Sequence, residues 1–448
     1  MSTICAISTP PGTGGIAIAR ISGPKAIEIA DSIWKGKPLA GATSHTAHLG
    51  TIIDPDSETD PELDRGVATI FRAPRSFTGE DTVELAIHGS TWVQRELINL
   101  LIRRGARIAE PGEFSRRAFT NGRLDLAEAE AVADMISSSS RAAHRIAMSH
   151  MRGDFSRRLA TLRDNLLHLC ALLELELDFS EEDVTFADRT QLISLAREVN
   201  DTVTAMASSF ATGNALKNGI NTAIVGATNA GKSTLLNRLL GDDKAIVSPI
   251  HGTTRDTIED TIEINGRLYR FIDTAGIRHT DDPIETIGIS RSIDAIKHAE
   301  IIIWVIDPSN PDTQTSAHIN PDVPVIAVIN KADLGLECPT LPIKPDITIS
   351  LSALADSNIT PLTDALATLT EQTTTPADLT ITNARHYQAL TAAAASTARA
   401  IDALGTDIPA DLVAQDLRET IHHLSTITGA ITTPDLLTHI FSHFCIGK

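Results

Sequence analysis

The eight residues from Gly226 to Ser233 (Gly-Ala-Thr-Asn-Ala-Gly-Lys-Ser) have the types and spacing of a loop that binds phosphate. The run 222–225 before them is apolar and β-branched, and the run 234–240 after them has helical periodicity. In this context, glycines let several backbone N–H groups and a helix N-terminus face one anion. Lys232 would add a cation for the outer phosphates, and Ser233 a hydroxyl ligand for Mg²⁺. The segment therefore predicts a P-loop.

Two later motifs indicate which base the nucleotide carries. Residues 330–333 (Asn-Lys-Ala-Asp) follow the apolar run 323–329, and residues 352–354 (Ser-Ala-Leu) follow the run 347–349. The Asp333 carboxylate can accept both hydrogens that a guanine edge presents, an arrangement that adenine does not offer. In this order and spacing the motifs resemble the GTPase set, and they predict GTP.

Two segments between the P-loop and the base motifs match catalytic parts of a GTPase. Residues 273–276 (Asp-Thr-Ala-Gly) end the run 268–272, so Asp273 can hold Mg²⁺ through water and the Gly276 N–H can reach the γ-phosphate. Residues 252–256 (Gly-Thr-Thr-Arg-Asp) resemble a switch loop. Thr254 in this loop would be the second Mg²⁺ ligand.

The residue after Asp-Thr-Ala-Gly departs from the Ras-like pattern, because it is Ile277 and not glutamine. Isoleucine cannot orient an attacking water, so either hydrolysis is feeble or other residues take this role. Glu285 and Arg278 lie just downstream and are candidate catalytic residues together with Lys232, although Glu285 also fits a solvated carboxylate at a helix start. Asn229 can help to ligate a monovalent cation, whose charge would act where an arginine finger acts in other GTPases.

Composition limits the partners and the compartment. The chain has 448 residues, enough for two or three domains, and 38 Lys and Arg against 57 Asp and Glu give a formal net charge of −19. This charge opposes a large nonspecific nucleic-acid surface, so RNA contact should be local or delegated to a partner. Four widely spaced cysteines suit a reducing compartment without structural zinc. With no signal-peptide pattern and no membrane-length apolar run, we expect a soluble cytoplasmic protein and no membrane contact.

Periodicity along the chain predicts a multidomain protein of α+β and α/β class. Residues 1–118 alternate β-rich runs with helical stretches, as in an α+β domain. Residues 119–216 and 373–448 are helical, and between them residues 217–372 hold the GTPase motifs. We therefore expect one discontinuous helical domain with a Ras-like P-loop GTPase domain inserted into it. The flanks would act as hinges at Gly213-Asn214 and at 373–376.

Individual elements follow from local patterns. The dipeptide Asn265-Gly266 favours a type I′ turn, so 257–264 and 267–272 should pair antiparallel in an otherwise parallel sheet. The strands expected in the first domain are 16–21, 66–71 and 82–87. The helices expected across the chain are 92–103, one that starts near Asp125, 155–173, 384–404 and 411–424.

Further signatures lie outside the GTPase segment. They are residues 20–23 (Arg-Ile-Ser-Gly), 76–81 (Ser-Phe-Thr-Gly-Glu-Asp), 111–115 (Pro-Gly-Glu-Phe-Ser), 117–121 (Arg-Ala-Phe-Thr-Asn), 124–131 (Leu-Asp-Leu-Ala-Glu-Ala-Glu-Ala) and 441–448 (Phe-Ser-His-Phe-Cys-Ile-Gly-Lys). Together with the central motifs, they resemble the MnmE (TrmE) family of bacterial tRNA modification GTPases over the whole chain.

The resemblance implies an N-terminal domain that binds folate and mediates dimerisation, with 5-formyl- or methylene-tetrahydrofolate as the one-carbon source. With the flavoprotein MnmG, in a heterotetramer, such a protein adds an aminomethyl or carboxymethylaminomethyl group to C5 of the wobble uridine in certain tRNAs. The two GTPase domains of a homodimer would meet across GTP in a K⁺-dependent way. This favours active hydrolysis despite Ile277, with Glu285 positioning water.

The resemblance also assigns the ligands of the nucleotide site. Mg²⁺ would be held by Ser233 and Thr254. K⁺ would be held by Asn229, Ser248, Ile250 and Thr253. The candidate GTP-binding residues are Asn229, Ala230, Gly231, Lys232, Ser233, Thr234, Ser248, Pro249, Ile250, His251, Gly252, Thr253, Thr254, Asp273, Thr274, Ala275, Gly276, Asn330, Lys331, Ala332, Asp333, Ser352, Ala353 and Leu354.

For folate, the matching positions are Arg20, Glu80, Arg123 and Lys448. Cations can meet the acidic parts of a pterin–glutamate, and a carboxylate can pair with the amino edge of the pterin. Arg123 stands where the family usually has lysine, which keeps the charge but replaces a point charge with a planar fork. Cys445 would lie near the folate, either as a nucleophile or as a small buried thiol.

Two alternatives compete with this interpretation. A ribosome-assembly or RNA-binding switch GTPase shares the central motifs but usually adds a basic RNA-binding module, which the net charge of −19 opposes. A folate-dependent transferase with a vestigial GTPase conflicts with the intact Lys232, Thr254, Asp273 and Asp333.

Overall fold

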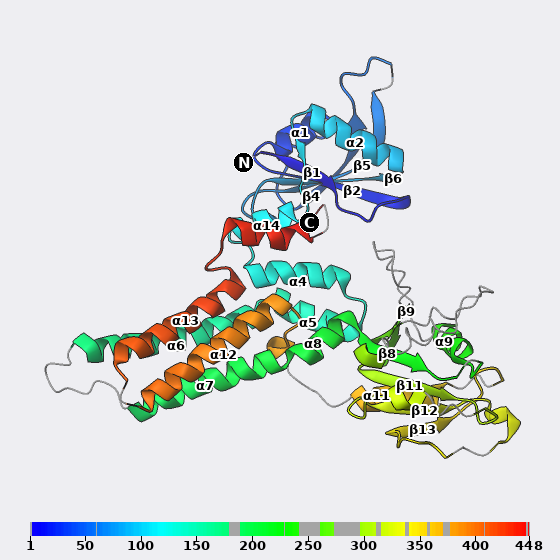
Figure 1. Cartoon of the computed structure of the whole chain (residues 1–448). Helices are drawn as coiled ribbons and strands as arrows, with labels where there is room; N and C mark the ends of the chain where they lie inside the picture. The colour runs from blue at the N-terminus through cyan, green and yellow to red at the C-terminus, as the bar shows by residue number, and fades with distance from the viewer. Residues whose placement is uncertain are drawn as a thin grey trace. The chain divides into compact units, whose positions relative to one another are not determined.

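The computed structural model of the chain describes residues 2–59, 61–178, 189–227, 229–241, 260–272, 296–310, 315–336, 340–355, 359–370, 377–406, 408–444 and 447 (Figure 1). It divides into two compact units. One contains residues 1–133, 150–163 and 421–448, and the other contains residues 134–149 and 164–420. No helix in the described ranges is long and apolar enough to cross a membrane.

The first unit is built on a seven-stranded sheet with the order β3-β4-β5-β6-β2-β1-β7. Neighbouring strands are antiparallel except for β1 and β7, which are parallel. The three strands predicted in this region are confirmed as β2, β5 and β6. The bounds are β1 Ile4–Ile7, β2 Gly14–Ser22, β3 Trp34–Gly36, β4 Thr46–Ile53, β5 Glu62–Phe71, β6 Thr82–Gly89 and β7 Arg107–Ile108.

Alternation along β2 gives this sheet two different faces. Ala19 and Ile21 point into a core covered by α1 (Ala26–Ser32) and α2 (Thr91–Arg103), to which α2 contributes Leu97, Leu100 and Leu101. Arg20 and Ser22 alternate with them, so they point to the opposite face. In Figure 1, α1 and α2 lie on one side of the sheet and α14 on the other. The polar residues of β2 therefore face the side where the chain ends.

The second face is covered by α3 (Glu113–Thr120) and α14 (Pro434–Ser442). Phe114 of α3 packs with Ile4 and Ala6 of β1, and Phe441 of α14 packs with Leu126. Gly112 just before α3 has φ 64°, and a side chain there would come within 2.5 Å of the Phe441 carbonyl oxygen. Only glycine fits this close approach, which fixes α14 against the start of α3.

The second unit holds a six-stranded sheet with the order β13-β12-β11-β8-β10-β9. All neighbours are parallel except β9 and β10, which form the predicted antiparallel hairpin. Asn265 and Gly266 have φ 51° and φ 81°, the two positive values of the expected type I′ turn. The bounds are β8 Ile220–Val225, β9 Asp260–Ile264, β10 Arg267–Ile272, β11 Ile301–Ile306, β12 Val325–Ile329 and β13 Ile347–Ser350.

Helices pack on both faces of this sheet or form a separate helical region. Leucines of α9 (Lys232–Gly241) and α11 (Thr360–Thr370) join one apolar cluster with β8, β11 and β12, while Ile296 and Ile319 join the cluster on the other face. The long helices confirm the predictions near Asp125 and at 92–103, 155–173, 384–404 and 411–424. Their bounds are α4 Leu126–Ser137, α5 Arg141–Met151, α6 Asp154–Asp178, α7 Arg189–Ser208, α8 Phe210–Asn218, α12 Ala384–Leu404 and α13 Ala410–Thr428.

The hinge predicted at Gly213-Asn214 has a different local structure. Both residues lie inside α8, and a side chain at Gly213 would come within 2.1 Å of the Ile381 carbonyl oxygen. Glycine serves here for close packing of a helix, and the role of Gly213-Asn214 as a hinge stays a prediction. The second predicted hinge, 373–376, lies outside the described residues.

Candidate nucleotide site and N-terminal polar network

The P-loop connects the buried strand β8 to helix α9, as its sequence predicts. At Gly226 (φ 142°) a side chain would come within 2.1 Å of the Val305 carbonyl oxygen, so this position requires glycine. At Gly231 (φ 97°) it would come within 2.1 Å of Asn330 Nδ2. The loop therefore runs directly over the ends of the neighbouring strands and delivers the N-terminus of α9, starting at Lys232, to the carboxyl edge of the sheet.

Asn330 ties together three motifs that are far apart in the sequence. Its side-chain Nδ2 donates to the Ala230 carbonyl in the P-loop at 2.7 Å, and its Oδ1 accepts from the Ala353 N–H at 2.9 Å. Its own backbone N–H donates to the Ile306 carbonyl at 2.8 Å. Because Asn330 is buried, these bonds satisfy its amide and fix the P-loop against the Ser-Ala-Leu loop.

The base-binding end of the site presents side chains to solvent. Asp333 and Leu354 are exposed, and within the described part of the chain no hydrogen bond or ion pair engages the Asp333 carboxylate. Ser352 is buried and its hydroxyl accepts from the Ala355 N–H, while the Ala332 N–H donates to the Leu351 carbonyl. Backbone bonds thus hold both loops in place while the Asp333 carboxylate is available for a base edge.

At the phosphate end, Lys232 Nζ donates to the carbonyls of Gly226 and Ala227, each at 2.7 Å. Ser233 and Thr234 follow in the first turn of α9, and Asn229 is exposed with φ 65°. The remaining sequence-predicted nucleotide residues lie outside the described residues and stay predictions. They are Ser248, Pro249, Ile250, His251, Gly252, Thr253, Thr254, Asp273, Thr274, Ala275, Gly276, Arg278 and Glu285.

A partly buried ion pair beside the base motif was not predicted from the sequence. Lys331 Nζ contacts Asp307 Oδ2, and the other carboxylate oxygen of Asp307 accepts from the Ser309 N–H at 2.9 Å and the Ser309 hydroxyl at 2.5 Å. Burial raises the pKa of Asp307, but the bonds from Lys331 and Ser309 outweigh it and hold this pKa below its usual range. Asp307 is therefore an anion at neutral pH.

In the first unit, Arg20 contacts two aromatic rings and a carboxylate. The Arg20 guanidinium carbon is 5.7 Å from the centres of the Phe77 and Phe114 rings, a cation–π distance. Arg20 faces Glu84 in the β2–β6 register, and its Nε donates to Glu84 Oε1 at 2.9 Å. Its Nη1 donates to the Gly447 carbonyl at 3.2 Å, so Gly447 near the chain end lies beside Arg20.

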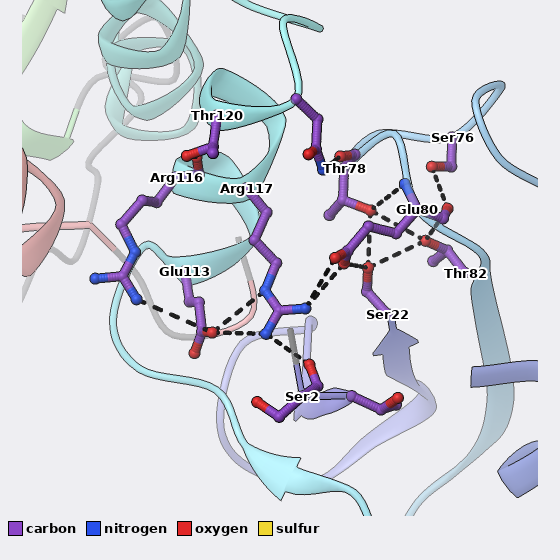
Figure 2. A network of polar contacts seen from close by, with 12 residues as sticks. Ser2, Ser22, Ser76, Thr78, Glu80, Thr82, Glu113, Arg116, Arg117 and Thr120 are labelled. Carbon is purple, nitrogen blue, oxygen red and sulfur yellow. Dashed lines mark hydrogen bonds and ion pairs between the residues drawn. The ribbon is translucent and has the colours of Figure 1, made fainter. Parts of the chain in front are cut away.

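Glu80 is held by a neighbouring arginine. Arg117 Nη1 donates to both Glu80 oxygens, at 2.9 and 3.1 Å, and the Ser22 hydroxyl donates to Glu80 Oε2 at 2.9 Å. Ser22 is also 2.8 Å from the Thr78 hydroxyl. In Figure 2, the Arg117 guanidinium points between the carboxylates of Glu80 and Glu113. The carboxylate predicted for folate thus belongs to a preassembled polar network.

The anchor of this network is Glu113, which is 2% exposed. It accepts from Arg117 Nη2 at 2.9 Å, from Arg107 Nη1 at 2.8 Å and from the Glu110 N–H at 3.0 Å. Burial raises the pKa of Glu113, but the hydrogen bonds from these donors lower it by more. The net pKa is about 2. Arg117 also donates to the Ser2 carbonyl at 2.8 Å. The network therefore joins α3, the 76–82 loop and the start of the chain.

Of the other predicted folate residues, only Arg123 is described. It is exposed, and its side-chain stem lies beside Gly79 in the 76–82 loop. Asn121 contacts the same loop, because its Nδ2 donates to the Thr78 carbonyl at 2.7 Å. Lys448 and Cys445 lie outside the described residues. The sequence analysis missed Glu84, Glu113 and Arg117, although the i, i+4 spacing of Glu113 and Arg117 in a predicted helix is a signal for an ion pair.

Comparisons with known proteins agree over the whole chain. A family model for the MnmE helical domain matches residues 126–445, and a model for the N-terminus of the GTP-binding protein TrmE matches residues 3–123. A relative from Parabacteroides distasonis, named tRNA modification GTPase MnmE, is 49% identical over 464 residues, and the match covers 100% of both chains. This chain belongs to the MnmE family.

Other MnmE relatives give the same result at full length. One from Bacteroides fragilis is 46% identical, covering 100% of this chain and 99% of the relative. One from Cytophaga hutchinsonii is 44% identical, covering 100% of this chain and 98% of the relative. As a member of the MnmE family, the chain is a GTPase, with GTP as its nucleotide and Mg²⁺ as the accompanying metal. The predicted fold class and the resemblance are confirmed.

Proposed function

We propose that this chain is the GTP-hydrolysing subunit of a complex that modifies C5 of the wobble uridine in tRNA. With MnmG as partner in a heterotetramer, it would help to add an aminomethyl or carboxymethylaminomethyl group, using a tetrahydrofolate one-carbon donor. The observation that carries this proposal is the full-length identity of 49% to a relative named tRNA modification GTPase MnmE. It is supported by the presence, in one chain, of a P-loop with a guanine-recognition motif at 330–333 and of a preassembled Arg–Glu network in the N-terminal unit.

The nucleotide site fits GTP with Mg²⁺. The first turn of α9 presents backbone N–H groups to an anion, Lys232 places a cation over the loop, and the Ser233 hydroxyl is an oxygen ligand for Mg²⁺. Thr254 would be the second ligand. Bound Mg²⁺ supplies positive charge against the γ-phosphate, while Asp333 orients the base and Asn330 keeps the loops in register.

We assign K⁺ to the same loop. Asn229 is exposed in the left-handed region, so its amide oxygen is available as a ligand beside the phosphates. Ser248, Ile250 and Thr253 would complete the site. Because Ile277 cannot orient water, Glu285 and Arg278 are the candidates for that role, in a site that is completed when the GTPase domains of a homodimer meet.

The N-terminal polar network fits a ligand with both an anionic end and amino hydrogens, as a folate has. Arg20 offers a guanidinium held between two rings, and Glu80 offers carboxylate oxygens fixed by Arg117 and Ser22. Arg123 and Lys448 would add cations for the glutamate tail. Bound tetrahydrofolate supplies the one-carbon unit, and Cys445 is a candidate nucleophile beside it. These residues bind and orient the cofactor.

The proposal also covers the domain organisation and the partners. We propose an N-terminal domain at 1–118, a helical domain at 119–216 and 373–448, and a GTPase domain at 217–372. The net charge of −19 indicates that tRNA is bound mainly through the complex with MnmG. A cytoplasmic location follows from the tRNA substrate.

Two measurements test this function. Mass spectrometry of tRNA nucleosides from a strain lacking the gene should show wobble uridine without its C5 group, and an unchanged nucleoside profile would reject the proposal in favour of a ribosome-assembly GTPase. In vitro, GTP hydrolysis should be stimulated by K⁺ and not by Na⁺. Equal rates in both salts would remove the K⁺ assignment of Asn229 without affecting the tRNA result.

A further inference from the structure

Asp307 and Lys331 stand side by side at the carboxyl edge of the second sheet. Ile306 of β11 pairs with Ile329 of β12 in a parallel register, and Asp307 and Lys331 follow these strand ends by one and two residues. β8, which leads into the P-loop, pairs with β11 on its other side. The Lys331 side chain therefore crosses from the base motif toward the P-loop along the edge where α/β sheets bind ligands.

Asp307 is built to hold one end of that side chain. It is 6% exposed, and the Ser309 N–H and hydroxyl both donate to one of its carboxylate oxygens, which fixes the direction of the group. The other oxygen contacts Lys331 Nζ. The donors from Ser309 and Lys331 therefore meet at one buried carboxylate. This contact holds the Lys331 ammonium in one position.

The other end of Lys331 is fixed by the backbone. Lys331 has φ 58°, a left-handed conformation that is uncommon outside glycine, and its neighbour Asn330 is locked by bonds to Ala230 and Ala353. A lysine side chain that is held at both ends can present its apolar stem as a flat strip. Ordering such a side chain costs rotamer entropy, and this arrangement makes the cost part of folding and not of nucleotide binding.

We propose that Asp307 is a positioning residue for guanine nucleotide binding, which holds the Lys331 stem as a platform for the face of the base while Asp333 reads its edge. The assignment goes beyond the GTPase motif set, which contains Lys331 and Asp333 but not Asp307. The ligand class is a guanine nucleoside di- or triphosphate. Asp307 acts through Lys331 and does not touch the nucleotide.

A double-mutant cycle on the full chain tests this proposal, with a fluorescent GDP analogue as the probe. Asp307→Ala and Lys331→Ala should each weaken binding about tenfold, since each removes one partner of a charged hydrogen bond. The double variant should bind as weakly as Lys331→Ala alone, because Asp307 acts only through that side chain. Additive losses, or an Asp307→Ala affinity within about twofold of wild type, would overturn the proposal.

A second readout separates positioning from a structural role. Inosine diphosphate lacks the exocyclic amino group that Asp333 recognises, so the ratio of GDP to inosine diphosphate affinity reports edge recognition. Asp307→Ala should lower both affinities by the same factor and leave the ratio unchanged, and a collapsed ratio would contradict the platform role. Asp307→Asn keeps the shape if the alanine variant does not fold, and should give a smaller loss of both affinities. Ser309→Ala removes the hydroxyl donor to Asp307 but keeps the N–H donor, so it should lower both affinities by a smaller factor than Asp307→Ala.

Discussion

The nucleotide site and the N-terminal polar network solve the same problem, holding side chains for a ligand, in different ways. The nucleotide site is positioned by backbone conformation and a neutral amide, through Gly226, Gly231 and the three bonds of Asn330. The N-terminal network is positioned by buried charges, with Arg117 between Glu80 and Glu113. We therefore expect a substitution that adds bulk to disrupt the nucleotide site most. A substitution that removes a charge should disrupt the N-terminal network most.

The largest effect should come from Arg117→Ala, which leaves Glu113 and Glu80 without their shared cation. Breaking a buried ion pair in this way costs about 3–5 kcal/mol of unfolding free energy. Hydrogen–deuterium exchange should show the loss of protection in α3 and in the 76–82 loop.

Arg116→Ala is the matched control for that change. Arg116 is the neighbouring arginine in α3, and its bond to Glu110 is exposed, so its removal should cost less than about 1 kcal/mol. Similar losses in both variants would mean that charge burial does not organise this region.

The next effect is a pH dependence of stability that arises in the N-terminal network. Folding lowers the pKa of Glu113 from 4.5 to about 2, so the folded state binds this proton less tightly than the unfolded chain. The resulting stability, about 3 kcal/mol, is present above pH 4.5 and is lost as the pH falls toward 2.

Acid unfolding of the Glu113→Gln variant measures this contribution. The variant should be less stable than wild type at pH 7, and the stability difference between the two proteins should shrink between pH 4.5 and pH 2. A difference that is constant over this range would show that Glu113 is not the ionised anchor.

Asn330→Ala is the corresponding change in the nucleotide site, and its main effect is expected on ligand binding. The Ala230 carbonyl and Ala353 N–H would each lose a buried partner, at about 1–3 kcal/mol per group. Because both groups lie in nucleotide loops, GDP affinity should fall by up to about a hundredfold. The loss will be smaller if the loops relax around the missing side chain. Isothermal titration with GDP measures this change, and an unaltered affinity would show that the loops hold their register without Asn330.

The fold was predictable where local rules decide it. The Asn265-Gly266 turn, the helix at 384–404 and the P-loop all follow from residues that are close in the sequence, and the structure confirms them. The helical conformation at Gly213 was not predicted, because glycine serves both in flexible linkers and in close helix packing, and only the approach of Ile381 distinguishes the two.

The candidate site was likewise predictable only where its residues are close together in the sequence. Asn330, Lys331 and Asp333 form a contiguous motif, so the sequence reveals them. Asp307 reaches Lys331 only through the pairing of β11 with β12, and Arg117 reaches Glu80 only through tertiary packing. An ion-pair partner is set by the fold and not by spacing, which is why these residues escaped the sequence analysis.

The central claim is that both regions serve one tRNA modification, and complementation of a strain lacking the gene tests it most directly. The wild-type chain, Lys232→Ala and Arg20→Ala would be expressed at matched levels, and wobble uridine nucleosides would be measured by mass spectrometry. We predict that the wild type restores the C5 group. Lys232→Ala in the nucleotide loop and Arg20→Ala in the N-terminal polar network should each fail to restore it. Full restoration by either variant would contradict the account.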